Sequence, residues 1–248
     1  MMWRDLSIPD RFAAAKAAGF AAAEIQVPGE ASTADWAAAS TTADLPILLL
    51  NLDMGDFLAG GPGLSGVPGR EDAFAQALAA GVEAVSLLKP QFLHIGPSRV
   101  PEGEKREACL ATYRANVAKA VAATAGLPVQ LLVEAINRAE APTALIGTTA
   151  EAAEIAAGFE GKLKLLFDLY HCAAGGEHPL ASYRAHADLI AHVQFSDHPG
   201  RQPPGRGTLD FAALFSGLEA EGYAGMYGAE YMSFTDTAAT LEWMADLR

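Results

Sequence analysis

Short apolar runs alternate with longer amphipathic stretches along the chain, and each pattern predicts one kind of element. The short runs, several of them closed by glycine or proline, are typical of buried parallel strands. They predict strands over residues 22–27, 45–52, 92–96, 129–136, 163–170, 189–197 and 225–231. The stretches between them carry apolar residues at helical spacing and predict helices. These cover residues 5–18, 34–39, 71–88, 104–125, 148–157, 179–187, 210–221 and 235–247.

The regular alternation of strand and helix indicates the fold. One strand and one helix recur about every 25–40 residues, as in parallel βα units. The GxGxxG at residues 61–66 does not directly follow a predicted strand, which favours a (β/α)8 TIM barrel over an open dinucleotide-binding sheet. No strand precedes the first helix, so we expect the first strand of the barrel to be missing. No Ser/Pro-rich linker interrupts residues 1–248, which predicts a single domain.

Two loops rich in glycine and proline interrupt this pattern. Residues 55–69 contain six glycines and two prolines, and the segment exceeds the about 4–6 residues of a typical connection. We expect it to lie over the strand ends, either as a lid on a site or as a surface excursion without a function. The second loop, 198–207, carries Arg201 and Arg206.

The overall charge excludes some classes of partner. A formal net charge of −13 opposes contact with phosphate backbones and anionic lipids, so neither nucleic acid nor a membrane is an expected partner. Charged Arg4 and Asp5 stand where a secretory signal needs apolar residues, and no apolar run reaches the roughly 18 residues of a membrane span. We therefore expect a cytoplasmic protein, either a monomer or a homo-oligomer. Cys109 and Cys172 lack metal or redox spacing and are expected to be free thiols.

Four polar residues fall near the ends of four consecutive predicted strands. They are Glu134, Asp168, Gln194 and Glu230, separated by 34, 26 and 36 residues, each about one βα unit. The C-terminal ends of barrel strands form the ligand-binding face, so all four side chains are expected to meet there. Three converging carboxylates would repel one another without a cation, and oxygen ligands suit Mg²⁺ or Mn²⁺. Taken singly, each carboxylate is as well explained by a helix cap or a salt bridge.

The same residues carry a resemblance to a known family. Five segments resemble hydroxypyruvate isomerase, a member of the xylose-isomerase-like barrel superfamily: VEAINR at 133–138, FDLYH at 167–171, VQFSDHPGR at 193–201, GAEY at 228–231 and GLSGVPGRE at 63–71. The resemblance extends over nearly all of the chain and implies a (β/α)8 barrel. It also implies a divalent metal held by Glu134, Asp168, Gln194 and Glu230, with the two glutamates as catalytic acid–base groups. Gln194 favours the hydroxypyruvate isomerase branch, because the ketose 3-epimerases of the superfamily usually carry histidine there.

The resemblance implies a reaction, the interconversion of hydroxypyruvate and tartronate semialdehyde (2-hydroxy-3-oxopropanoate). A C–H proton beside a carbonyl would leave and return to the neighbouring carbon through an enediolate, which a metal on both substrate oxygens would stabilise. Glu134 and Glu230 are predicted to relay the proton. Asp168 and Gln194 would chiefly hold the ion.

Two further residues are predicted to contact the substrate. His171 follows Asp168 by three positions and either donates to a substrate oxygen or orients a neighbouring ligand. The Arg201 guanidinium would pair with the substrate carboxylate, because it binds such a group bidentately; the alternative is a solvated loop charge. Weaker candidates for this contact are Arg206, His94 and His198.

Three alternatives remain open at this point. A sugar isomerase or ketose 3-epimerase would use the same metal and glutamates on a longer substrate. A metal-dependent nuclease of similar fold is disfavoured by the acidic charge and by the few histidines at strand ends. A non-catalytic barrel that acts as a binding or scaffold protein would accommodate the missing first strand.

Overall fold

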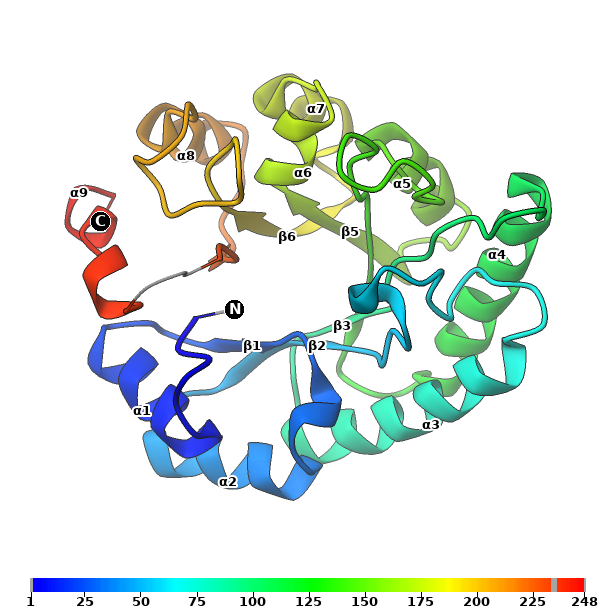
Figure 1. The fold of residues 1–248 in the computed structure, drawn as a ribbon, viewed down its shortest axis with the longest axis horizontal. Helices are drawn as coiled ribbons and strands as arrows, with labels where there is room; N and C mark the ends of the chain where they lie inside the picture. Colours follow the sequence, from blue (N-terminus) through cyan, green and yellow to red (C-terminus); the bar gives the residue numbers. More distant parts are fainter. Residues whose placement is uncertain (1, 233–235, 248) are drawn as a thin grey trace.

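Seven parallel strands form one sheet that curves into a barrel, with helices on its outer side (Figure 1). The computed structural model describes residues 2–232 and 236–247. The strands are β1 Ala23–Ile25, β2 Ile47–Asn51, β3 Phe92–His94, β4 Gln130–Glu134, β5 Leu163–Asp168, β6 Ile190–Phe195 and β7 Tyr227–Ala229. The α-helices are α1 Ile8–Ala17, α2 Thr33–Ala43, α3 Glu71–Leu88, α4 Arg106–Ala123, α5 Thr149–Ala157, α6 Leu169–Ala174, α7 Pro179–His186, α8 Phe211–Ala220 and α9 Trp243–Asp246. Short 3₁₀ turns are η1 Pro28–Glu30, η2 Phe57–Ala59 and η3 Ala238–Thr240.

The helices begin where side chains satisfy their free backbone N–H groups. Ser32 caps α2 in a capping box with Asp35, in which each side chain bonds the backbone of the other residue. Thr148 caps α5 by accepting from the Glu151 backbone. The Glu151 carboxylate bonds Gly147 N instead of closing the reciprocal half of such a box. These local signals fix the helix starts, and packing against the sheet supplies most of the remaining stability.

The strands bury both faces, but the two faces pack against different partners. One face meets the surrounding helices in the main apolar core. The other face points into the barrel, where a smaller cluster closes the lower interior; it contains Leu48, Leu49, Phe92, Leu132 and Leu166. Side chains two residues apart in a strand share a face. His94, Glu134 and Asp168 stand two residues after Phe92, Leu132 and Leu166, so they also point into the barrel. The apolar layer therefore supports a polar layer at the C-terminal ends of the strands.

Most of the predicted elements are confirmed, with shorter bounds, and two are corrected. The predicted strand 163–170 ends at Asp168, because the Asp168 side chain accepts from Tyr170 N and caps the short helix α6, which was not predicted. The prediction of a continuous helix over 235–247 is wrong for residues 236–247, the part that the structure describes. That part holds only η3 and α9. There the Thr240 hydroxyl donates to the Thr237 carbonyl and also bonds the Tyr231 hydroxyl, which competes with a continuous helix.

The barrel is open between β7 and β1. Within residues 2–232 and 236–247, β1 pairs only with β2 and β7 only with β6, so the expected absence of a first strand is confirmed. The segment between α1 and β1 contacts α9 at this opening, through Phe20 and Trp243. Trp3 N donates to Thr237 Oγ1 at 2.8 Å, which ties the two ends of the chain together.

Aromatic side chains fill the opening. The Trp243 ring of α9 lies 5.3 Å from the Phe195 ring of β6, 6.4 Å from Tyr231 and 6.5 Å from Phe20, measured between ring centroids. Phe20 in turn meets Trp3 edge to face at 6.1 Å. An unpaired strand edge exposes backbone groups to other chains, and this cluster covers the edge in place of a strand.

The Gly-rich segment 55–69 is tied to the rim of the barrel. Ser65 Oγ donates to the Gly96 carbonyl at 2.8 Å, and Gly66 N donates to Ser98 Oγ at 2.9 Å. The Asn116 amide of α4 donates to the Ser65 carbonyl at 3.0 Å. These contacts fix the second half of the segment over the β3–α4 connection. No helix in the described part of the chain has both the length and the apolar character needed to cross a bilayer.

Trp243→Ala should destabilise the protein by about 2 kcal/mol, less than a fully buried tryptophan would, because the ring is half-buried. The loss should appear as a lower urea midpoint with a similar slope. Leu87→Ala, at a side chain that is 55% exposed, is the matched control and should shift stability by no more than about 0.5 kcal/mol. Equal effects of the two substitutions would show that the aromatic cluster does not close the barrel.

Candidate active site

The structure places the four sequence-predicted polar residues at the C-terminal end of the barrel. Glu134 and Asp168 are the last residues of β4 and β5, Gln194 lies in β6, and Glu230 follows β7 directly. Gln194 is the register partner of Asp168, and partners in neighbouring parallel strands project to the same face. All four are nearly buried, with exposed fractions between 1% and 9%. They are therefore positioned by strands rather than by loops.

Arg201 joins two of these carboxylates. Its Nη2 lies 3.1 Å from Asp168 Oδ2 and 2.9 Å from Glu230 Oε2, and its Nε donates to the Glu230 carbonyl at 3.2 Å. The Glu230 backbone also bonds Phe195 O, which holds the residue against β6. The structure thus brings Asp168, Glu230 and Arg201 into direct contact. A single guanidinium compensates two buried carboxylates.

His171 presents an N–H group to the site. Its Nδ1 accepts from Asn137 Nδ2 at 2.8 Å and faces Asn137 N at 3.4 Å. The Asn137 amide is held in this orientation because its Oδ1 accepts from Glu140 N. A neutral imidazole whose Nδ1 accepts must carry its proton on Nε2. That Nε2 lies 3.8 Å from both Glu134 Oε1 and Asp168 Oδ2, so His171 is a donor directed at the carboxylates.

His94 has the opposite tautomer. Its Nδ1 lies 3.2 Å from Asn51 Oδ1, and the Asn51 amide nitrogen is occupied by the Gln26 carbonyl, so Nδ1 donates. His94 Nε2 is then a bare acceptor, 3.8 Å from Glu134 Oε2 and without a hydrogen bond to any described residue. Burial lowers the pKa of both His94 and His171 to about 4, so both rings are neutral at pH 7. Glu134 lies between a donor and an acceptor.

The two glutamates hold their protons more tightly than ordinary carboxyls. Burial raises the pKa of Glu134 well above its ordinary value, and the charges of Glu230 and Asp168 raise it further. Burial also raises the pKa of Glu230 to about 7, against the opposing effect of Arg201. Burial disfavours the charged form of Arg201, but Glu230 and Asp168 outweigh it and raise the guanidinium pKa above its ordinary value. The site therefore carries an excess of negative charge.

Gln194 contacts a residue that the sequence patterns did not single out. Its Nε2 donates to Glu24 Oε2 of β1 at 2.6 Å, and His192 Nε2 lies 2.5 Å from Glu24 Oε1. Burial alone would raise the pKa of Glu24. The charge of His192 and the hydrogen bonds from His192 and Gln194 outweigh burial, so the pKa is lowered. Gln194 makes no hydrogen bond to Asp168 or Glu230 among the described residues. The signal that could have revealed Glu24 is its position on the inward face of a short strand.

The donor set fits a divalent cation. One ligand atom each from Glu134, Asp168 and His171 lie within 4.8 Å of one another. The tautomer of His171 leaves Nε2 without a free lone pair, so the carboxylates are the better ligands. Glu134 Oε1 and Gln194 Oε1 are both buried without a hydrogen-bond partner in the described part of the chain. Oxygen atoms of this kind suit a hard cation, which would also relieve the repulsion that raises the glutamate pKa values.

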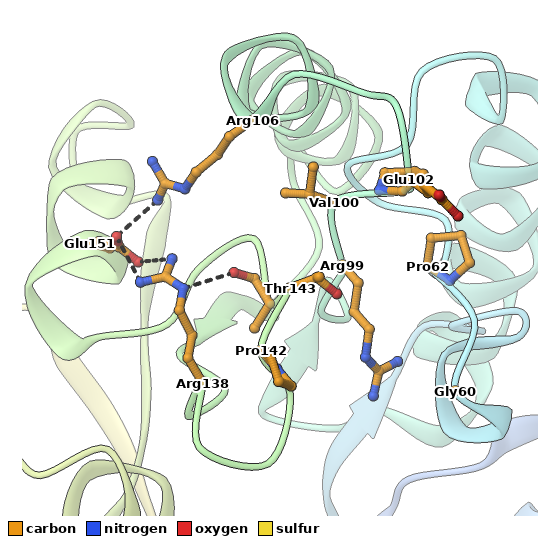
Figure 2. Close-up of a pocket in the computed structure, with 12 residues that line it drawn as sticks. Gly60, Pro62, Arg99, Val100, Glu102, Arg106, Arg138, Pro142, Thr143 and Glu151 are labelled. Atoms are coloured by element: carbon orange, nitrogen blue, oxygen red, sulfur yellow. Dashed lines mark hydrogen bonds and ion pairs between the residues drawn. The ribbon is translucent and has the colours of Figure 1, made fainter.

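A separate groove of about 870 Å³ has the charged side chains Arg99, Glu102, Arg106, Arg138 and Glu151 in its lining (Figure 2). Arg106 and Arg138 both point to the Glu151 carboxylate, at 2.9 and 2.7 Å. Arg99 turns away from them, donates to the Phe57 carbonyl at 2.8 Å and lies over the Phe57 ring. The groove contains none of the predicted catalytic residues, so the carboxylate cluster inside the barrel is the candidate active site.

A polar layer of acid–base groups at the C-terminal end of a TIM barrel defines a class of enzyme, and comparisons with known proteins identify the family. A family model described as "Xylose isomerase-like TIM barrel" matches residues 12–247, and the chain belongs to this family. A 2-oxo-tetronate isomerase of Cupriavidus necator is 32% identical over 245 residues, which cover 98% of this chain and 94% of the relative.

Two further relatives extend the comparison. A putative hydroxypyruvate isomerase of Mus musculus is 34% identical over 244 residues, covering 96% of this chain and 88% of the relative. A solved structure from Brucella melitensis, described as an AP endonuclease of family 2, matches with a TM-score of 0.92 at 29% identity and covers 100% of this chain and 96% of that chain. The prediction of an isomerase on a xylose-isomerase-like barrel is confirmed.

Arg201→Met should destabilise the metal-free protein by about 3 kcal/mol, because it leaves Asp168 and Glu230 buried without the guanidinium that pairs with both. Arg201→Lys keeps the charge and should lose less. Chemical unfolding after treatment with a chelator measures both variants. A loss under about 0.5 kcal/mol for the methionine variant would mean that protonation of the carboxyls, rather than the guanidinium, compensates the site.

Proposed function

We propose that the protein is a divalent-metal-dependent isomerase that interconverts hydroxypyruvate and tartronate semialdehyde (2-hydroxy-3-oxopropanoate). The observation that carries the proposal is the pair of buried glutamates, Glu134 and Glu230, which share Asp168 and Arg201 as neighbours. A carboxylate with a raised pKa is a stronger base near neutral pH than an ordinary one. The names of the two isomerase relatives support the same type of reaction.

The reaction needs two proton movements, and the site offers groups for both. One glutamate takes a proton from carbon 3 of hydroxypyruvate, and the other delivers a proton to carbon 2, so that the substrate passes through an enediolate. The hydroxyl proton moves from the oxygen on carbon 3 to the oxygen on carbon 2. His171 Nε2–H can donate to the carbonyl oxygen and His94 Nε2 can accept from the hydroxyl, because the two rings have opposite tautomers.

Arg201 is the group for the substrate carboxylate. Its Nε and Nη2 are engaged by Glu230 and Asp168, while Nη1 makes no hydrogen bond to any residue in 2–232 or 236–247. The side chain is 20% exposed, more than any of the carboxylates it compensates. The Nη1 group can donate to a substrate carboxylate oxygen while Nε and Nη2 keep their own partners.

The proposed metal ligands are Glu134, Asp168, Glu230 and the Oε1 of Gln194. Mg²⁺ or Mn²⁺ bound there would supply positive charge that stabilises the negative charge developing on the substrate oxygens. His171 is assigned to the substrate rather than to the ion, because its Nε2 carries a proton. Glu134 and Glu230 would each hold the ion and also exchange a proton with the substrate, and Glu230 would do so while its Oε2 is paired with Arg201.

A second candidate is a 2-oxo-tetronate isomerase, which the relative from Cupriavidus necator favours. The chemistry would be the same, on an acid one carbon longer. The structure does not separate the two acids, because both offer the same carbonyl, hydroxyl and carboxylate groups to the site. Parallel assays of the two acids at equal concentration separate the candidates.

Proton NMR of hydroxypyruvate in D₂O tests the proposal directly. The protein should introduce deuterium at carbon and form 2-hydroxy-3-oxopropanoate. Treatment with a chelator should abolish both signals, and Mn²⁺ should restore them, because without the ion nothing would stabilise the negative charge that develops on the substrate oxygens. Metal-dependent exchange without the product would point to a related substrate, and product formation that survives chelation would exclude the metal.

Glu134→Gln and Glu230→Gln should each lower kcat at least about 100-fold, because a neutral amide cannot accept the substrate proton. Glu107→Gln, at an exposed position in the first turn of α4, is the matched control and should leave kcat unchanged. Steady-state kinetics with saturating Mn²⁺ measure all three variants. Activity of either site variant within a few-fold of the parent would remove that glutamate from proton transfer.

A further inference from the structure

Glu24 occupies the barrel interior, yet the proposed reaction assigns it no role. One of its oxygens lies 2.5 Å from His192 Nε2, and the other accepts from Gln194 Nε2 at 2.6 Å. His192 is in turn stacked on Phe92, with 5.2 Å between ring centroids, so the ring is held in place. A pairing with His192 alone would explain one oxygen of Glu24. It would not explain the second oxygen, which accepts a hydrogen bond from the Gln194 amide.

The backbone opposite Glu24 leaves room for this contact. Gly228 of β7 is the register partner of Gln194. A Cβ at position 228 would collide with Glu24 Oε1 and would lie 3.0 Å from Gln194 Cγ. Only glycine therefore lets the Glu24 carboxylate and the Gln194 side chain meet at this height in the barrel.

The contact determines which end of the Gln194 amide faces the site. A carboxylate only accepts hydrogen bonds, so the NH₂ group of the amide must point to Glu24. The carbonyl oxygen, Oε1, must then point the other way. Oε1 is buried and has no hydrogen-bond partner in the described part of the chain. With the amide reversed, an NH₂ group would occupy this position, and an NH₂ group cannot bind a cation.

We propose that Glu24 is a positioning residue, which holds the Gln194 amide so that Oε1 is available as a ligand and thereby sets the affinity of the site for a divalent cation. This inference rests on the proposed function, because it needs the metal site. It extends that function to a residue of β1, the strand at the open edge of the barrel. Groups that orient a metal ligand typically change metal affinity by about 10- to 100-fold when they are removed.

Two variants that conserve the net charge test the inference. Glu24→Asp keeps the charge but shortens the side chain by one methylene, so the carboxylate no longer reaches Gln194. The exchange Glu24→Gln with Gln194→Glu reverses donor and acceptor. The new glutamine donates to the new glutamate and still accepts from His192, while a carboxylate oxygen remains in the ligand position.

Mn²⁺ binding to metal-free protein, followed by electron paramagnetic resonance, is the readout. Glu24→Asp should raise the Kd for Mn²⁺ at least about tenfold, and the exchange variant should stay within about threefold of the wild type. Glu151→Asp in the outer groove is the matched control and should bind Mn²⁺ like the wild type. A role in folding alone would lower stability in urea but leave the Kd of folded molecules unchanged.

The outcomes separate this inference from the proposed function. Unchanged Mn²⁺ affinity in Glu24→Asp, with normal binding by the wild type, would overturn the role of Glu24 and leave the proposed function intact. Weakened binding in both variants would also overturn it, since packing rather than amide orientation would then control affinity. A wild type that binds no Mn²⁺ would overturn both. Should Glu24→Asp fail to fold, the exchange variant decides alone: retained binding supports the inference and a tenfold loss overturns it.

Discussion

The structure depends on compensating several carboxylates that are buried at one end of a barrel. Taking a carboxylate out of water is costly unless hydrogen bonds or opposite charges replace the lost hydration. Here the compensation is incomplete: Arg201 pairs with both Asp168 and Glu230, while the side chains in direct contact with Glu134 include two neutral histidines. The raised pKa values of the two glutamates follow from this deficit. The proposed cation site and the proposed proton transfer both depend on this deficit.

The sequence predicted those features that depend on local pattern and on spacing. Apolar runs revealed most of the strands, because strands buried on both faces lack the alternation of a surface strand, and alternation itself revealed the strand at 22–27. One βα unit between successive strand ends placed Glu134 and Asp168 correctly on one face. Helix α6 was missed, because the Asp168 side chain caps a helix immediately after its own strand. A residue that serves as both strand end and helix cap gives no separate helix signal.

Other parts of the site depend on contacts between distant segments. Glu24 and Gln194 are 170 positions apart and meet only because the barrel brings β1 opposite β6. The tautomers of His94 and His171 are set by Asn51 and Asn137, and no sequence pattern marks these amides as partners. The two ends of the chain meet at the open edge through Trp3 and Thr237. Pairing of the strands and curvature of the sheet, rather than local propensity, create all of these contacts.

The opposite tautomers of the two site histidines give the site a hydrogen-bond donor on one side and an acceptor on the other. His171 offers hydrogen and His94 offers a lone pair, with Glu134 between them. A ligand whose carbonyl lies near His171 and whose hydroxyl lies near His94 satisfies both rings, whereas the same ligand turned end for end faces donor with donor and acceptor with acceptor. Two buried asparagines, Asn51 and Asn137, thus set which way round a ligand with one acceptor and one donor fits between the two rings.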